Sequence, residues 1–209
     1  MNNYRYVIMC GGTYPQWEIP KQLQKVNGER LIDRTIRLLR ENGVTDIAIT
    51  SHDNAFIGLG ASVIRHKNNY GKGGEWTEGF WLTDEPACYI FGDVYFSPAA
   101  IKTIVETETD SIEFFASAPP YSPQYNRRWA EPFAFKVADQ SYFRQCITEA
   151  ETLHKYGVLH RLISWELWQV IKKTPLNEID YTNYVAINDY TCDIDNPEDI
   201  AALERVLNE

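Results

Sequence analysis

Three places in the sequence carry residues that could bind a phosphorylated ligand together with a divalent cation. The first is the segment CGGTYPQ at residues 10–16, which is followed by Pro20-Lys21. Gly11 and Gly12 would let the backbone approach a ligand closely, and successive N–H groups can bind a phosphate. Lys21 would neutralise part of the charge of a triphosphate. The loop fits neither G-x-G-x-x-G nor G-x-x-x-x-G-K-S/T, which argues against the usual dinucleotide and P-loop sites, and an ordinary turn is the alternative.

The second place is FGDVYF at residues 91–96, where Asp93 follows an apolar run. An acid at the carboxyl end of a parallel strand lies where open α/β sheets bind their ligands. Mg²⁺ is usually held by one or two carboxylates and by phosphate oxygens of the substrate. Asp93 is therefore a candidate magnesium ligand, and the alternative is a solvated aspartate at a strand end.

The third place is CDIDNPED at residues 192–199. Side chains alternate along an extended segment, so Asp193 and Asp195 would point the same way and could face one cation. Glu198 and Asp199 follow Asn196-Pro197 and are better explained as acids in the first turn of a helix. Asp193 precedes that helix start, so it and Asp195 are the candidates for a metal site.

Strand and helix patterns alternate along the chain and predict the scaffold that holds these residues. An apolar run over 4–10 ends at two glycines, and 31–42 has one apolar helical face with Gly43 at its end. Further strands are expected at 45–50, 61–66, 87–93, 111–117, 131–137 and 184–189, and further helices after Ser97-Pro98, at 139–154, at 161–173 and after Asn196. This order predicts an α/β fold with a mostly parallel, Rossmann-like sheet in a single domain over 1–209, and a small middle lobe at 118–160.

Composition and charge limit the classes of protein that fit. The 209 residues are 44% hydrophobic and 23% charged, which suffices for a core without disulfide or metal staples. The net charge of −9 argues against a general nucleic-acid partner, because such proteins usually carry a basic face. A small anionic ligand is still compatible, since it needs only a few local cations and oriented N–H groups.

The cysteines and the apolar runs point to an intracellular protein. Cys10, Cys88, Cys146 and Cys192 are scattered without zinc spacing, so we expect buried free thiols in a reducing compartment. The apolar run at residues 6–10 is too short for a signal peptide or a membrane span. The sequence thus predicts a cytoplasmic protein with no membrane partner.

The order of these blocks resembles one protein family. A strand, a Gly-Gly loop (CGG, 10–12), PKQLQKVNGERLI (20–32), a helix, Gly92-Asp93 and DIDNPED (193–199) follow one another. This order is similar to that of GT-A-like nucleotidyltransferases, which activate sugar phosphates, choline phosphate, methylerythritol phosphate or sialic acids. No single block is specific, but their order spans nearly the whole chain.

The resemblance implies roles for individual residues. Gly11 and Gly12 would contact the nucleotide, Lys21 would bind its phosphates, and Lys21 and Asp93 would be the catalytic residues. Asp93 would ligate Mg²⁺ with a second carboxylate from Asp193 or Asp195. In NYGKGG (69–74), Gly73 and Gly74 would belong to a loop that contacts the base, or else to a plain glycine turn.

The implied reaction transfers a nucleoside monophosphate from a nucleoside triphosphate to a phosphorylated small metabolite and releases pyrophosphate. YSPQYNRRW (121–129) would select the acceptor, because arginines suit its phosphate and aromatic rings suit a sugar face. The same cluster would also suit a contact with another subunit, which leaves a homodimer open.

One departure from the family pattern bears on catalysis. The family loop continues as G-x-G-x-R, whereas here Tyr14 stands in place of the glycine and Gln16 or Trp17 near the arginine. Either another cation replaces that arginine, for which Lys25, Arg30 and Lys72 are candidates, or the chain is a non-catalytic nucleotide-binding protein. A molybdopterin-type guanylyltransferase and a GT-A glycosyltransferase are further alternatives, the latter disfavoured because Asp93-Val94-Tyr95 is not D-x-D.

Overall fold

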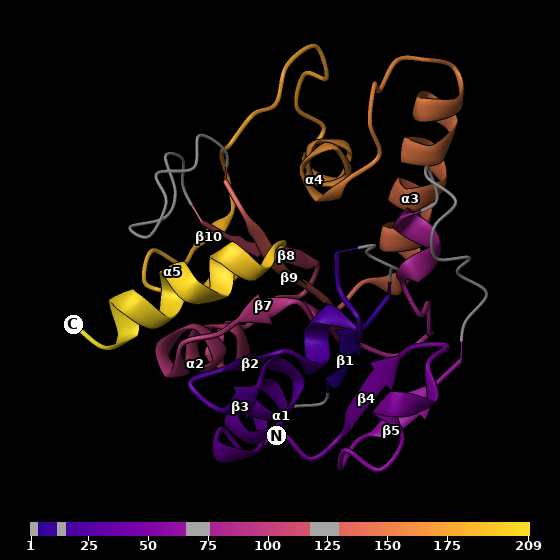
Figure 1. The fold of residues 1–209 in the computed structure, drawn as a ribbon. Helices are drawn as coiled ribbons and strands as arrows, with labels where there is room; N and C mark the ends of the chain where they lie inside the picture. The colour runs from indigo at the N-terminus through magenta and orange to yellow at the C-terminus, as the bar shows by residue number, and fades with distance from the viewer. Residues whose placement is uncertain (1–3, 12–15, 66–75, 118–129) are drawn as a thin grey trace.

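A seven-stranded sheet forms the centre of the protein in a computed structural model that describes residues 4–11, 16–65, 76–117 and 130–209 (Figure 1). The strand order is β10-β8-β9-β6-β1-β4-β5. The bounds are β1 (Arg5–Met9), β4 (Ile47–Thr50), β5 (Ser62–Ile64), β6 (Ala87–Phe91), β8 (Ile112–Ala116), β9 (Pro132–Val137) and β10 (Val185–Ala186). Each predicted strand is present, with its ends moved by a few residues.

The sheet is mostly parallel, as predicted, and β9 is its exception. β1 pairs in parallel with β4 and β6, β4 with β5, and β8 with β10. β9 lies between β6 and β8 and is antiparallel to both. The N-terminal end of β9 therefore lies at the same edge as the carboxyl ends of β6 and β8.

Two helical layers cover the two faces of the sheet (Figure 1). The helices are α1 (Leu31–Glu41), α2 (Pro98–Glu106), α3 (Gln140–Lys155), α4 (Ser164–Lys172) and α5 (Pro197–Leu207). Tyr6 and Ile8 of β1 belong to the core shared with α1, α2 and α5, whereas Val7 belongs to the core shared with α3 and α4. This alternation is what a strand buried on both faces requires.

The helix boundaries have the local causes that the sequence indicated. Ser97 Oγ accepts a hydrogen bond from the Ala100 N–H at 2.9 Å, directly before the proline that starts α2. α1 ends before Gly43, whose φ of +79° suits glycine. Asn196 and Asp199 form a capping box at the start of α5, which confirms the interpretation of Asp199 as a helix-start acid.

Several short elements were not predicted. β2 (Lys25–Val26) and β3 (Glu29–Arg30) form a hairpin whose turn residues Asn27 and Gly28 have φ of +48° and +86°. β7 (Val94–Tyr95) pairs with β11 (Cys192–Asp193) in an antiparallel ladder. The 3₁₀ helices are η1 (Lys21–Leu23), η2 (Asn54–Phe56) and η3 (Trp76–Gly79).

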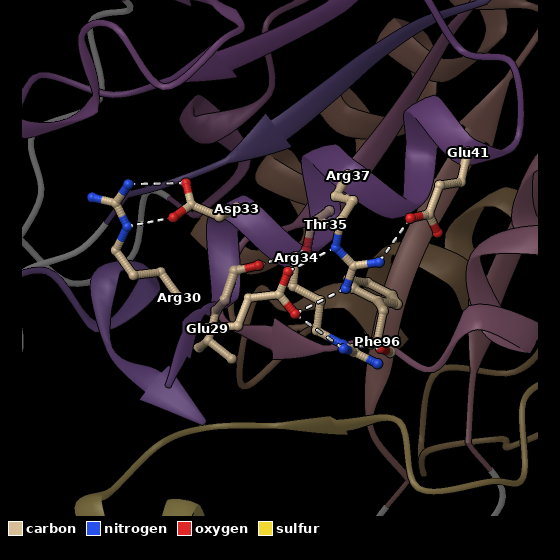
Figure 2. Close-up of polar contacts among 9 residues, drawn as sticks. Glu29, Arg30, Asp33, Arg34, Thr35, Arg37, Glu41 and Phe96 are labelled. Carbon is tan, nitrogen blue, oxygen red and sulfur yellow. Dashed lines mark hydrogen bonds and ion pairs between the residues drawn. The ribbon is translucent and has the colours of Figure 1, made fainter. Parts of the chain in front are cut away.

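A charged cluster joins the β2–β3 hairpin to α1 (Figure 2). Arg37 Nε and Nη2 donate to the two oxygens of Glu29 at 2.8 and 2.9 Å, and Arg34 Nη1 donates to the same carboxylate at 3.2 Å. Arg34 Nε also donates to the Phe96 carbonyl at 2.8 Å, and its guanidinium lies over the Tyr95 ring. Glu29 thus fixes the segment that follows η1 against α1 and β7.

The cysteines, the helix lengths and the middle lobe were also predicted from the sequence. All four cysteines are buried, and none of them forms a disulfide within the described residues. None of the helices in the described ranges is both long and apolar enough to cross a bilayer. Of the predicted middle lobe, 118–129 lies outside the described residues, and β9 and α3 belong to the central sheet and its helical layer.

Candidate functional site

The carboxyl ends of β1 and β6 lie side by side and bring Asp93 next to the loop after β1. Met9 pairs with Phe91, and the Gly92 N–H donates to the Met9 carbonyl at 3.0 Å. A Cβ at Gly92 would lie 2.7 Å from that carbonyl oxygen and 2.7 Å from Cys10 Sγ. Glycine is therefore required here by close backbone approach, and it places Asp93 beside the end of β1.

The β7–β11 pair brings the late aspartates to the same place. Asp193 pairs with Val94, and the Ile194 N–H donates to the Asp93 carbonyl at 3.0 Å. Asp93 and Asp193 are thus neighbours although a hundred residues of chain separate them. This pairing brings Asp193 to the end of β6, where Asp93 lies.

Lys21 lies at the centre of the aspartates. Its Nζ is 2.6 Å from Asp93 Oδ2, 3.2 Å from Asp195 Oδ1 and 4.0 Å from Asp193 Oδ1. The Lys21 side chain is only 2% exposed, so this ammonium is enclosed by the carboxylates that it contacts. When all three carboxyl groups are ionised, the three carboxylates and one ammonium carry a formal charge of −2.

Asp193 has the most perturbed environment of the three. Burial raises its pKa well above the usual range, the Asp93 charge raises it further, and Lys21 opposes both. Its Oδ1 is buried and has no hydrogen-bond partner among the described residues. Its backbone N–H donates to Glu131 Oε2 at 3.0 Å, and Glu131 is itself 2% exposed.

The donor set suits a hard divalent cation. Carboxylate oxygens are the ligands that Mg²⁺ prefers, and Asp193 Oδ1 has no hydrogen bond to lose on binding one. Within the described ranges, no group of three or more histidine, cysteine, aspartate or glutamate side chains is already arranged to hold a metal ion. Asp93, Asp193 and Asp195 instead surround Lys21 Nζ, so their role as metal ligands stays a prediction.

The loop after β1 is only partly described. The Gly11 carbonyl accepts a hydrogen bond from Gln22 Nε2 at 3.4 Å, which ties the loop to η1. Gly12 lies outside the described residues, and so do Gly73 and Gly74 of the proposed base-contacting loop. The acceptor segment 121–129 lies outside them too. Their predicted contacts with nucleotide and acceptor stay predictions.

Gln16 and Trp17, which stand near the position of the family's arginine, form hydrogen bonds within the protein. Gln16 Nε2 and Trp17 Nε1 both donate to the Asp195 carbonyl, at 3.1 and 3.2 Å. Of the candidate replacement cations, Lys72 lies outside the described residues, and Arg30 forms a two-point ion pair with Asp33 at 2.5 and 3.0 Å. This pair occupies Nε and Nη2 of Arg30, so a phosphate would compete with Asp33 for these donors.

Two residues to which the sequence assigned no role of their own, Glu131 and Gly92, shape the site. Glu131 holds the Asp193 backbone, and its local sequence does not indicate that this acid is buried, because its polar partners are distant in the chain. Gly92 directly precedes Asp93, the candidate metal ligand. An isolated glycine at the end of a strand can indicate that another backbone approaches closely, so the sequence did contain a signal for Gly92.

Solved structures of nucleotidyltransferases have the same fold as this chain. A protein described as a glucose-1-phosphate thymidylyltransferase from Bacillus anthracis has a TM-score of 0.64 at 15% identity, over 99% of this chain and 96% of that one. The inositol-1-phosphate CTP transferase from T. maritima has a TM-score of 0.57 at 15% identity, over 99% and 97%. The CTP:phosphocholine cytidylyltransferase from Streptococcus pneumoniae has a TM-score of 0.55 at 16% identity, over 98% and 99%. No protein-family model matches the sequence, and neither does any curated protein sequence.

Proposed function

We propose that this chain is a Mg²⁺-dependent nucleotidyltransferase. It transfers a nucleoside monophosphate from a nucleoside triphosphate to a phosphorylated small metabolite, a sugar phosphate or an alcohol phosphate, and releases pyrophosphate. The proposal includes a cytoplasmic location. The shared fold of proteins described as acting on glucose 1-phosphate, inositol 1-phosphate and phosphocholine supports this substrate class.

The observation that carries the proposal is the convergence of Lys21, Asp93, Asp193 and Asp195. These residues come from three separate parts of the chain and meet at the carboxyl edge of a mostly parallel sheet. Ligands of open α/β sheets bind at this edge. A buried lysine among carboxylates matches the two needs of triphosphate chemistry, a fixed positive charge and oxygen ligands for Mg²⁺.

The reaction needs little covalent help from the protein. An oxygen of the acceptor phosphate, already ionised at neutral pH, forms a bond to the α-phosphorus. The bond from the α-phosphorus to the oxygen that bridges it to the β-phosphorus breaks, and pyrophosphate leaves with that oxygen and the electron pair. No proton has to be removed, so catalysis rests on positioning and on stabilising negative charge.

Each residue of the site then has a distinct task. Lys21 Nζ would donate hydrogen bonds to the phosphate oxygens that gain charge. Asp93 and Asp193, with Asp195 beside them, would hold Mg²⁺, which supplies positive charge to the triphosphate. Gln16 and Trp17 would keep the Asp195 segment in place by their hydrogen bonds to its carbonyl.

Pyrophosphate release provides the test. The purified chain is incubated with Mg²⁺, with each of CTP, UTP, GTP, ATP and dTTP, and with a panel of sugar phosphates and alcohol phosphates. We expect one nucleotide and one acceptor class to give pyrophosphate and a nucleotide-linked product, and Asp93→Asn to give neither. Asp110→Asn, which changes an exposed aspartate, is the matched control and should keep the activity.

Two other outcomes would contradict the proposal. A nucleotide that raises the Tm without any product would favour a non-catalytic binding protein. Release of a nucleoside diphosphate from nucleotide sugars, with no use of triphosphates, would favour a glycosyltransferase.

A further inference from the structure

Lys21 contacts the same oxygen atoms that the proposed metal would need. Its Nζ is 2.6 Å from Asp93 Oδ2 and 3.2 Å from Asp195 Oδ1, within hydrogen-bond range of both. Mg²⁺ binds carboxylate oxygens at about 2.0–2.1 Å. A cation on these oxygens would therefore lie within a few ångströms of the ammonium, where the repulsion between like charges is strong.

Lys21 also lies close to Asp193. Its Oδ1 is buried, and the ammonium of Lys21 stands 4.0 Å away, too far for a hydrogen bond. The Lys21 side chain is almost fully enclosed, so it fills the space between the three carboxylates. An ion that binds Asp93 Oδ2 and Asp193 Oδ1 together would therefore compete with Lys21 Nζ for these oxygens.

We infer that Lys21 is the built-in counter-ion of the metal site, and that a triphosphate and Mg²⁺ bind with positive coupling because the triphosphate draws Lys21 away from the carboxylates. The inference rests on the proposed function and adds to it the way in which the site is loaded. In this arrangement Lys21 neutralises part of the crowded negative charge and competes with metal. Phosphate oxygens offer the ammonium an alternative partner, and the carboxylates are then released to the metal.

The coupling follows from linkage. If nucleotide raises the affinity for metal by some factor, metal raises the affinity for nucleotide by the same factor. Mg²⁺ and triphosphates also associate in solution, so the coupling that belongs to the protein must be measured through Lys21 itself. Metal binding in the absence of nucleotide isolates the competition between Lys21 and the metal.

Titration with Mn²⁺ alone, followed by electron paramagnetic resonance and repeated with Mg²⁺ by calorimetry, is the direct experiment. We expect wild-type protein to bind the metal weakly and Lys21→Met to bind it more tightly by roughly tenfold or more, within the usual range of site coupling. Lys21→Arg keeps the positive charge and should bind as weakly as wild type. Lys155→Met removes an exposed lysine at the end of α3 and should also match wild type.

The Tm gives a second readout that needs no nucleotide and no activity. Without Lys21 the carboxylates repel one another, so Lys21→Met should melt at lower temperature in metal-free buffer and regain stability when Mg²⁺ is added. Wild type should respond little to Mg²⁺ alone. A Lys21→Met protein that is folded yet shows neither tighter metal binding nor this rescue would overturn the inference.

The inference and the proposed function fail in different ways. Equal metal affinity of wild type and Lys21→Met would refute the counter-ion role even if the enzyme transfers nucleotides normally. Tighter metal binding by Lys21→Met supports that role whether or not transfer is detected. A protein in which nucleotide leaves the metal affinity unchanged would refute the coupling.

Discussion

Glu131 Oε2 accepts a hydrogen bond from the backbone N–H of Asp193 at 3.0 Å, and so joins the start of β9 to β11. Glu131 is 2% exposed, its own N–H donates to Ser117 Oγ, and its carbonyl accepts from the Ser117 N–H. This contact is possible because β9 is reversed in the sheet, so that its first residues lie at the edge where β6 and β8 end. Glu131 is a positioning residue for Asp193.

Replacing Glu131 should separate its acceptor role from its charge. Glu131→Ala leaves the partly buried N–H of Asp193 without its acceptor, which costs about 1–3 kcal/mol. We expect a lower Tm and a higher Mg²⁺ concentration for half-maximal turnover. Glu131→Gln keeps an amide oxygen as the acceptor and should restore most of both properties. Equal Mg²⁺ dependence of the alanine variant and wild type would show that Glu131 does not position Asp193.

Asp93→Asn should abolish turnover and leave the fold intact. The substitution removes one of three crowded carboxylates and a proposed metal ligand, so we expect turnover to fall by roughly a hundredfold or more. The far-UV circular dichroism spectrum should be unchanged. Steady-state pyrophosphate release at saturating Mg²⁺ is the measurement. Retention of more than about a tenth of the wild-type rate would exclude Asp93 as an essential ligand.

Gly92→Ala tests the close approach between β6 and β1. The added Cβ would meet Met9 O and Cys10 Sγ, each at 2.7 Å, and the backbone oxygen cannot move without shifting β1. We expect a cost of about 1–3 kcal/mol, as for overpacked sites, and turnover should fall because Asp93 is displaced. Gly157→Ala is the comparison, since a Cβ there meets nothing within 4 Å and only its φ of +73° is unfavourable. Gly157→Ala should lose stability without losing turnover per folded molecule.

Lys136→Met tests a buried lysine far from the site. Lys136 Nζ donates to the carbonyls of Ile104, Val105 and Thr107 at 3.1, 2.9 and 2.6 Å, and so satisfies the C-terminal end of α2. Losing these bonds should cost about 1–3 kcal/mol, which lowers the Tm of a domain of this size by about 2–4 °C per kcal/mol. Turnover at moderate temperature should not change.

The same lysine predicts the direction of a pH effect. Burial lowers the pKa of Lys136 below its usual value of 10.5. Between the lowered pKa and 10.5 the unfolded chain holds a proton that the folded chain lacks, so the contribution of Lys136 to the free energy of unfolding rises with pH. The difference in Tm between wild type and Lys136→Met should therefore widen from neutral pH toward pH 10.5. A difference that narrows would contradict this assignment.

The long elements could be predicted because their causes are local. Ser97-Pro98 and Asn196-Pro197 mark helix starts through caps and a fixed φ, and the apolar runs of β1 and β6 mark strands buried on both faces. The acids at positions 93, 193 and 195 could be selected because they follow such a run or precede such a cap. The place of Asp93 follows from the rule that parallel strands end at one edge, whereas Asp193 reaches it through the antiparallel β7–β11 pair.

The rest depends on partners that are distant in sequence. β7 and β11 have two residues each, too few to show a period, and they form only because they pair with each other. The reversed direction of β9 has no signature in its apolar sequence. Nothing around Lys21 or Glu131 indicates that these charged side chains are buried, because the groups that surround them come from segments far along the chain.

The order of the strands along the chain also sets when the site can form during synthesis. All seven strands of the central sheet have been made by Ala186, whereas Asp193 and Asp195 follow it. Proteins of this size are synthesised at about 5–20 residues per second and begin to fold from the N-terminal side. A nascent chain can therefore assemble its sheet while Lys21 has only Asp93 among its three carboxylate partners. Pairing of β11 with β7 then completes the cluster, so a released chain that ends just before Cys192 would keep every strand of the central sheet and lack Asp193 and Asp195.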